Sequence, residues 1–170
     1  MRFHLRVWTR HLVPVEEVWR AHTDPDALCA SLGMSPAWVE GAVAPDGDAP
    51  RETVLRVRGP LGRGLPAWPL RLSHVEPGVR YVDTSENAWF HAWTHEHLFE
   101  PTPDGCRYVD AITFAPAGPA PALVADVLTR VMVRRHRWFA RRLASDARAT
   151  GVAVLRARVE DGWDPPSDSA

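Results

Sequence analysis

The feature that most constrains the fold is one long uninterrupted segment near the end of the chain. The sequence holds 16 prolines and 11 glycines, yet neither residue type occurs between positions 122 and 149. Apolar side chains recur there at helical spacing, namely Val124, Leu128, Val131, Met132, Phe139 and Leu143. We therefore predict an amphipathic helix of about 28 residues that ends at Gly151, with a stripe that has to be buried against a large partner.

The chain before this helix is divided by turn residues into short segments that are typical of strands. Phe3, Leu5 and Val7 alternate with more polar positions, which indicates a half-buried strand at the start. Further strands are predicted at about residues 38–43, 53–58, 68–74, 80–85, 90–100 and 107–114, with a turn at 45–50 and a loop at 59–66.

Two short helices are predicted between the first strand and the others. Pro14 suits the first turn of one helix, and Asp24-Pro25 reads as an N-cap followed by proline at the first position of the next. Gly33 is expected to end the second helix. Strands grouped together with helices set apart indicate an α+β fold, in which a curved antiparallel sheet wraps around the long C-terminal helix. We expect one domain over residues 1–151 and a C-terminal tail over 152–170.

Composition argues against several classes of partner. The formal net charge is -1, so no general field attracts nucleic acid. No window approaches the roughly 20 apolar residues of a membrane span, and the N-terminus does not resemble a signal peptide. Cys29 and Cys106 are expected to be free thiols. A cytoplasmic protein without stable membrane insertion, monomeric or homodimeric, is the expectation.

The order of several short motifs resembles a known superfamily. The motifs are Pro14–Trp19, Tyr81-Val82-Asp83, Trp93–Phe99, Asp110–Phe114 and Pro116-Ala117-Gly118. In this order and spacing they resemble the START-like (SRPBCC, polyketide cyclase/dehydrase-like) proteins, a superfamily that includes the birch-pollen-allergen-like helix-grip proteins. The resemblance covers about residues 3–148.

The resemblance implies a helix-grip fold with a cavity between the sheet and the C-terminal helix. It does not imply one activity, because this fold hosts carriers, receptors and cyclases. The chain departs from its relatives at residues 87–90, where Asn87-Ala88-Trp89-Phe90 replaces a Gly-Pro-aromatic turn that borders the cavity mouth. The identity of a ligand therefore cannot be carried over from a relative.

Histidines on one predicted strand are the main candidates for chemistry. Alternation along residues 90–100 places His91, Trp93, His95, His97 and Phe99 on one face, and the aromatic residues indicate that this face points inward. On the next strand Tyr108, Asp110, Ile112 and Phe114 share a face. A tight hairpin joins the two strands, so Asp110 is expected near a histidine.

Three interpretations of this cluster remain open. His95 or His97, oriented by Asp110, would serve as a general acid or base on a bound carbonyl compound. Alternatively, the same residues form a buried polar network that stabilises the sheet. A metal site would need a third ligand such as His91 or Asp110 beside the His-x-His pair, and since only proximity on one strand is indicated we predict no metal and no cofactor.

Aromatic side chains are the candidates for the cavity wall. The predicted ligand-binding residues are Trp68, Trp89, Trp93, Phe99, Phe114, Met132 and His136. His136 is alternatively a solvated residue, because the helix around it is crowded with arginines: Arg134, Arg135, Arg137, Arg141 and Arg142. These arginines are expected on the outer helix face.

The function predicted first is binding of a small hydrophobic or amphipathic ligand in the internal cavity. The alternative is a cyclase- or dehydratase-type enzyme that uses His95 or His97 with Asp110. A third possibility is a protein-interaction module that binds through the arginine-rich helix.

Overall fold

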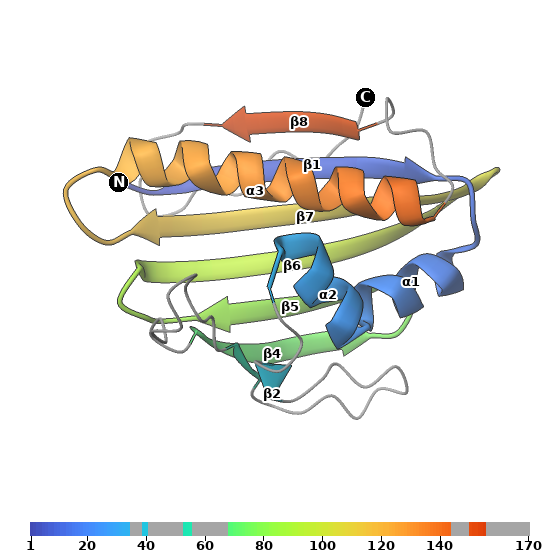
Figure 1. Cartoon of the computed structure of the whole chain (residues 1–170), viewed down its shortest axis with the longest axis horizontal. Helices are drawn as coiled ribbons and strands as arrows, with labels where there is room; N and C mark the ends of the chain where they lie inside the picture. Colours follow the sequence, from blue (N-terminus) through green and yellow to red (C-terminus); the bar gives the residue numbers. More distant parts are fainter. Residues whose placement is uncertain (35–38, 41–52, 56–67, 144–149, 156–170) are drawn as a thin grey trace.

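The computed structural model describes residues 1–34, 39–40, 53–55, 68–143 and 150–155 (Figure 1). The helices are α1 (Val15–Thr23), α2 (Pro25–Leu32) and α3 (Pro121–Arg142). The strands are β1 (Phe3–His11), β2 (Val39–Glu40), β3 (Thr53–Leu55), β4 (Trp68–Glu76), β5 (Arg80–Ser85), β6 (Phe90–Thr102), β7 (Gly105–Pro116) and β8 (Thr150–Leu155).

The strands of the described residues form one antiparallel sheet in the order β2-β3-β4-β5-β6-β7-β1-β8. The helix α3 lies along one face of this sheet and contacts β1 and β7, while α1 and α2 cover the same face (Figure 1). The predicted α+β helix-grip arrangement, a curved antiparallel sheet around a C-terminal helix, is confirmed. The predicted turn at 45–50 and loop at 59–66 lie outside the described residues.

The second short helix begins and ends at the residues that the sequence predicts, and Pro14, expected in the first turn of the other helix, is the N-cap of α1. The Asp24 side chain accepts a hydrogen bond from the backbone N–H of Asp26 at 3.0 Å, and Pro25 occupies the first position of α2. The helix ends at Gly33, whose backbone N–H donates to the carbonyl of Ala30. Capping satisfies backbone groups that a helix end otherwise leaves unpaired.

The long helix is shorter than predicted, and the predicted end at Gly151 is wrong. The helix α3 ends at Arg142, and Gly151 lies in β8, which pairs with β1. A Cβ atom at Gly151 would lie 2.1–2.5 Å from three atoms of the Trp8 ring, so glycine permits a close approach between these strands. The first residues of the predicted 152–170 tail therefore belong to the sheet.

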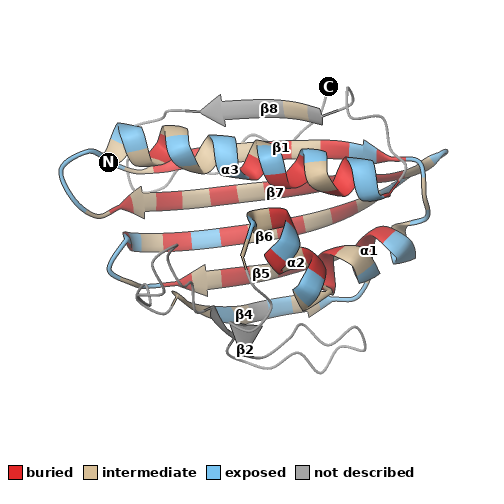
Figure 2. Ribbon diagram, viewed as in Figure 1, coloured by how far each residue is buried: buried red, intermediate tan, exposed pale blue. Residues whose placement is uncertain are grey.

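The core of the described residues holds two apolar clusters, and a band of buried polar side chains accompanies them. Figure 2 shows the buried positions along β1 and β7 and in the second half of α3. The first cluster consists of Phe3, Leu5, Val7, Phe90, Trp93, Ile112, Phe114, Ala125 and Met132. The second cluster consists of Val18, Trp19, Ala27, Tyr81, Phe99, Cys106, Tyr108, Phe139 and Leu143. The free Cys29 and Cys106 are both buried.

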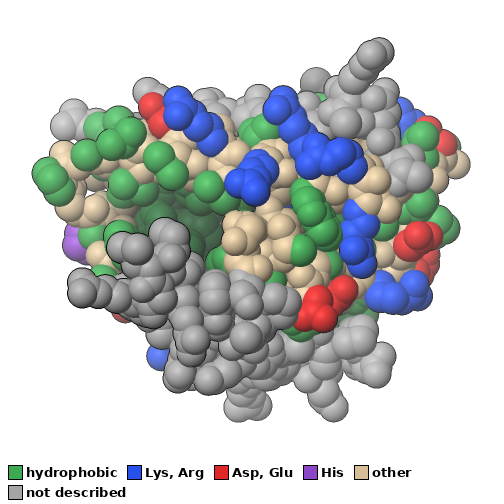
Figure 3. Space-filling model, in the orientation of Figure 1, with side chains coloured by type: hydrophobic (Ala, Val, Ile, Leu, Met, Phe, Trp, Pro, Cys, Tyr) green, Lys and Arg blue, Asp and Glu red, His purple; other side chains and the backbone are tan. Residues whose placement is uncertain are grey.

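The surface is hollowed beside the first half of α3. Figure 3 shows hydrophobic side chains on the floor of this hollow, which in the orientation of Figure 1 lies beside the helix over β6 and β7. The first half of α3 contributes Val124 and Leu128, which are partly buried against the first cluster together with Trp68 and Val133. Around the buried first cluster there are thus apolar side chains that remain partly exposed.

Candidate functional site

The polar band consists of seven residues that are all buried: Asp83, His95, His97, Tyr108, Asp110, Arg135 and His136. Strand pairing brings four of them together, because β5 and β6 place Asp83 opposite His95, and β6 and β7 place His97 opposite Asp110. The side chains of a strand alternate between faces, so these inward positions form one patch on the sheet.

Asp110 is the centre of the band. Its Oδ1 accepts from His95 Nε2 at 3.0 Å and from the Tyr108 hydroxyl, while its Oδ2 accepts from Arg135 Nη1 at 2.8 Å and from His136 Nε2 at 3.0 Å. Burial alone would raise the pKa of Asp110, but the Arg135 guanidinium and the facing histidines hold this pKa well below its ordinary value. The group is therefore an ionised carboxylate surrounded by donors.

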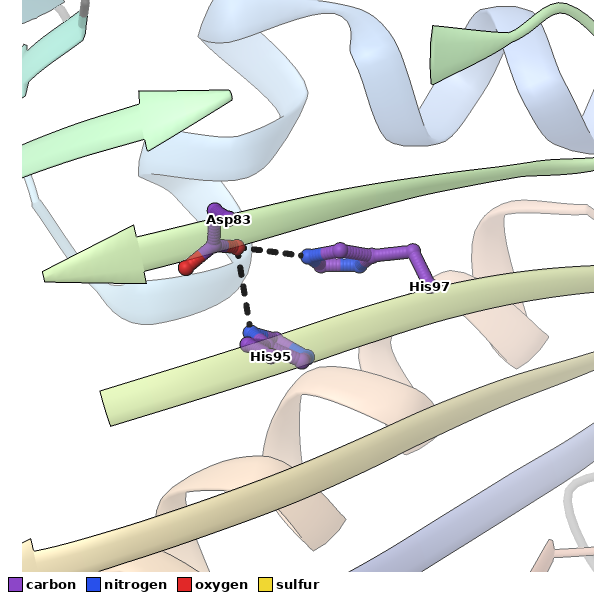
Figure 4. Close-up of side chains that lie close together, drawn as sticks. All are labelled: Asp83, His95 and His97. Atoms are coloured by element: carbon purple, nitrogen blue, oxygen red, sulfur yellow. Dashed lines mark hydrogen bonds and ion pairs between the residues drawn. The ribbon is translucent and has the colours of Figure 1, made fainter. Parts of the chain in front are cut away.

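Asp83 is a second carboxylate that meets both histidines of the His-x-His pair (Figure 4). Its Oδ2 lies 2.9 Å from His97 Nε2 and 3.4 Å from His95 Nδ1. Its Oδ1 accepts the indole N–H of Trp93 at 2.8 Å. Burial opposes ionisation of Asp83, yet His95 and the hydrogen bond from His97 lower its pKa, whereas burial and the neighbouring His97 lower the pKa of His95.

Two residues of α3 reach into the band, which corrects the predicted solvated helix face. His136 is buried, donates from Nε2 to Asp110 and accepts at Nδ1 from the Thr9 hydroxyl at 2.8 Å. Arg135 is 2% exposed and also donates from Nη2 to the Tyr108 hydroxyl at 3.2 Å. Helical periodicity places both residues on the inward face with Met132.

The structure brings together the three residues predicted for catalysis. The expected meeting of Asp110 with a histidine is confirmed, because His95 Nε2 and His97 Nδ1 each lie 3.0 Å from Asp110 Oδ1.

His91 is exposed, contrary to the predicted inward face. A β-bulge between Phe90 and Ala92 shifts the alternation at that point.

The residues predicted for the cavity wall occupy different environments. Trp93, Phe114 and Met132 belong to the first cluster, and Trp68 packs against it. Phe99 belongs to the second cluster and His136 to the polar band. Trp89 is 48% exposed in the turn before β6, so it lies outside both clusters.

Three members of the band were not singled out from the sequence. Asp83 is the last residue of the Tyr81-Val82-Asp83 motif, Arg135 is one of several arginines in a basic run, and Tyr108 shares a face with Asp110. The signal for Arg135 was its spacing of three residues from Met132, which places it on the apolar stripe. An arginine there requires a buried acidic partner.

The other arginines of α3 follow the expectation of an outer face. Arg134, Arg137, Arg141 and Arg142 are exposed. A groove of about 420 Å³ runs along this side of the helix, lined by Thr129, Arg130, Val133, Arg134, Arg137 and Arg141.

Among the described residues, no helix combines the length and apolar character needed to cross a membrane.

Comparisons with known proteins agree with this architecture. A protein from Rhodobacter sphaeroides is 20% identical, with a TM-score of 0.61 over 84% of this chain and 92% of that chain. Ara h 8.0201 is 14% identical, with a TM-score of 0.62 over 85% and 99% of the two chains. An AHSA1-like protein from Aeromonas hydrophila is 17% identical, with a TM-score of 0.54 over 84% and 94%.

These similarities show the fold, which is the START-like (SRPBCC) helix-grip fold that the sequence motifs indicated. No curated protein matches the chain. The family model described as a domain of unknown function, DUF8410, matches residues 13–143. The chain therefore belongs to the DUF8410 family.

Proposed function

We propose that the protein binds a small amphipathic molecule in the hollow beside α3. The apolar part of the ligand lies on the first cluster, and its polar end points toward the polar band. The observation that carries this proposal is the position of Trp93, which belongs to the first cluster and donates its indole N–H to Asp83 at 2.8 Å. Apolar surface and a hydrogen-bonding network therefore meet at one side chain.

The partly buried side chains around the first cluster support the same proposal. Trp68, Val124 and Leu128 pack against the cluster and are only partly buried. A ligand that buried such surface would gain free energy of about 25 cal/mol per Å² of apolar area. Ligand sites in proteins commonly combine an apolar lining with a few polar groups that fix orientation.

Titration with 8-anilino-1-naphthalenesulfonate, an amphipathic fluorescent probe, tests this site. Leu128→Trp replaces an aliphatic side chain beside the first cluster with a bulky indole ring that would occupy the space of the probe. We expect it to weaken probe binding by about tenfold or more, which corresponds to roughly 1.4 kcal/mol. Leu123→Trp is the matched control, because Leu123 is 63% exposed on the same helix. Equal affinities for both variants and the unaltered protein would contradict the proposal.

Acid–base catalysis by the polar band is a second candidate function. It is favoured by the 3.0 Å contact between His95 Nε2 and Asp110, which fixes the tautomer and orientation of that imidazole. In a cyclase- or dehydratase-type reaction, His95 or His97 would move a proton on the bound compound. Mass spectrometry of the compound extracted from the protein, before and after incubation with fresh protein, tests this role.

His95→Gln is expected to lower any conversion by about 10²–10⁴-fold while the far-UV circular dichroism spectrum stays unchanged. A compound that the unaltered protein leaves chemically intact would remove this candidate and leave the binding proposal standing.

A further inference from the structure

Three ligand-type atoms converge inside the polar band. They are Asp83 Oδ2, His95 Nδ1 and His97 Nε2, and all lie within 4.8 Å of one another. The two nitrogen atoms lie 3.4 Å and 2.9 Å from the carboxylate oxygen. Ligand atoms at about 2.0–2.1 Å from a tetrahedral zinc ion lie roughly 3.3 Å apart. The 3.4 Å separation fits a shared ion as it stands, and the 2.9 Å hydrogen-bond distance would lengthen by about 0.4 Å when the ion replaces the proton.

The outer hydrogen bonds fix where the imidazole protons lie. His97 Nδ1 faces the Tyr108 hydroxyl at 2.7 Å and Asp110 Oδ1 at 3.0 Å. Tyr108 donates its own proton to Asp110 and accepts from Arg135, so His97 Nδ1 has to be the donor in this contact. His97 Nε2 also forms a hydrogen bond with Asp83 Oδ2 at 2.9 Å, and when a metal ion displaces the proton of that bond, the neutral ring directs the Nε2 lone pair at the ion.

His95 repeats this arrangement. Its Nε2 donates to Asp110 Oδ1 at 3.0 Å, so a neutral ring directs the lone pair of Nδ1 at Asp83 Oδ2. Asp83 is an acceptor when ionised. Three acceptors that face one point repel one another unless a positive centre lies between them, and that centre is either a proton on an imidazole or a metal ion.

We propose that Asp83, His95 and His97 bind one divalent transition-metal ion of the zinc type. Two histidines and one carboxylate form a common ligand set of catalytic zinc and non-haem iron sites. The third ligand is thus Asp83, in place of the His91 or Asp110 considered from sequence. His91 is exposed, and both oxygens of Asp110 are occupied by donors.

The surrounding residues resemble the outer shell of an established metal site. Each histidine donates from its second nitrogen toward Asp110, and Trp93 donates to Asp83 Oδ1, the oxygen that does not face the histidines. Carboxylate–histidine–metal arrangements of this kind orient the ligands and strengthen them as bases. The proposal stands independently of the ligand proposed for the hollow.

The test is a calorimetric titration of tag-free, chelator-treated full-length protein with ZnCl₂. We expect one zinc ion per chain. His97→Gln is expected to weaken binding by more than about 100-fold, since outer-shell partners alone contribute about 10–100-fold, and Trp93→Phe by about tenfold. His91→Gln is the matched control, because it removes an exposed histidine of the same strand and should leave zinc affinity unchanged.

Nuclear magnetic resonance of the unaltered protein decides the question even where a variant fails to fold. Zinc is expected to shift the ¹⁵N signals of His95 Nδ1 and His97 Nε2. The proposal is overturned if the metal-free protein shows an imidazolium at His97 and takes up no stoichiometric zinc, or if zinc binding is lost in His91→Gln and kept in His97→Gln.

Discussion

Arg135 on α3 donates to the Asp110 carboxylate on β7 across 2.8 Å, and both side chains are almost completely buried. This ion pair connects the long helix to the sheet at the centre of the polar band. It also determines the charge state on which the other contacts of Asp110 depend.

Arg135→Met is expected to reduce the free energy of unfolding by about 3–5 kcal/mol, because it leaves the buried Asp110 charge without its cationic partner. Urea unfolding followed by circular dichroism measures the loss. Arg137→Met, on the exposed side of the same helix, serves as the control and should leave stability almost unchanged. A loss no larger than that of the control would show that the ion pair does not stabilise the fold.

The stability of the protein is expected to fall in acid through two groups of residues. Burial holds the pKa of His22 well below its ordinary value of 6.5, with the Arg135 charge acting in the same direction. The unfolded chain therefore binds a proton that the folded chain does not, and stability decreases as the pH falls below 6.5. The pKa values of Asp83 and Asp110 lie below the ordinary 3.8. Their contributions to the stability of the fold are therefore fully present above pH 3.8 and are lost as the pH falls below it.

His22→Phe isolates the histidine contribution. The ring of His22 lies between Tyr108 and Phe139, with centroids 3.7 Å from each, and neither of its nitrogens has a hydrogen-bond partner among the described residues. The stability of the unaltered protein is expected to fall by up to about 1.4 kcal/mol per pH unit below pH 6.5 because of His22, and we expect the variant to lose this part of the slope. Unfolding at several pH values measures the slope, and an unchanged slope would contradict this role.

The contact between Trp8 and Gly151 is expected to control the pairing of β1 with β8. Gly151→Ala places a methyl group within 2.1–2.5 Å of Trp8 ring atoms, and we expect a loss of about 1–3 kcal/mol from overpacking. Combining it with Trp8→Val should recover part of that loss, and a double-mutant cycle from thermal unfolding measures the coupling. Additive effects of the two substitutions would argue against the contact.

Alternation and hairpin geometry were sufficient to predict the meeting of His95 and Asp110. Both residues lie on long strands joined by a tight turn, so the period of two fixed their faces and the turn fixed their register. The same reasoning failed at His91, because a β-bulge between Phe90 and Ala92 shifts the alternation of side chains there. The residue pattern alone does not predict this bulge.

The remaining parts of the site depend on contacts between elements that are distant in sequence. Asp83 meets His97 through the register of β5 against β6, and Arg135 meets Asp110 through the rotation of α3 over the sheet. A run of arginines on a helix is usually solvated, so the sequence alone does not indicate that Arg135 points inward. The residue pattern predicts the end of the helix and the start of the tail where the structure has β8, because the pairing of β8 with β1 is non-local.

Native mass spectrometry of the full-length protein, purified from its host without denaturation, tests the binding proposal most directly. The proposed site predicts that a small amphipathic molecule is carried at one copy per chain and that Leu128→Trp reduces its occupancy, while Leu123→Trp does not. Equal occupancy in the two variants would show that the molecule binds elsewhere, and a ligand-free mass together with no uptake of amphipathic probes would contradict the proposed function.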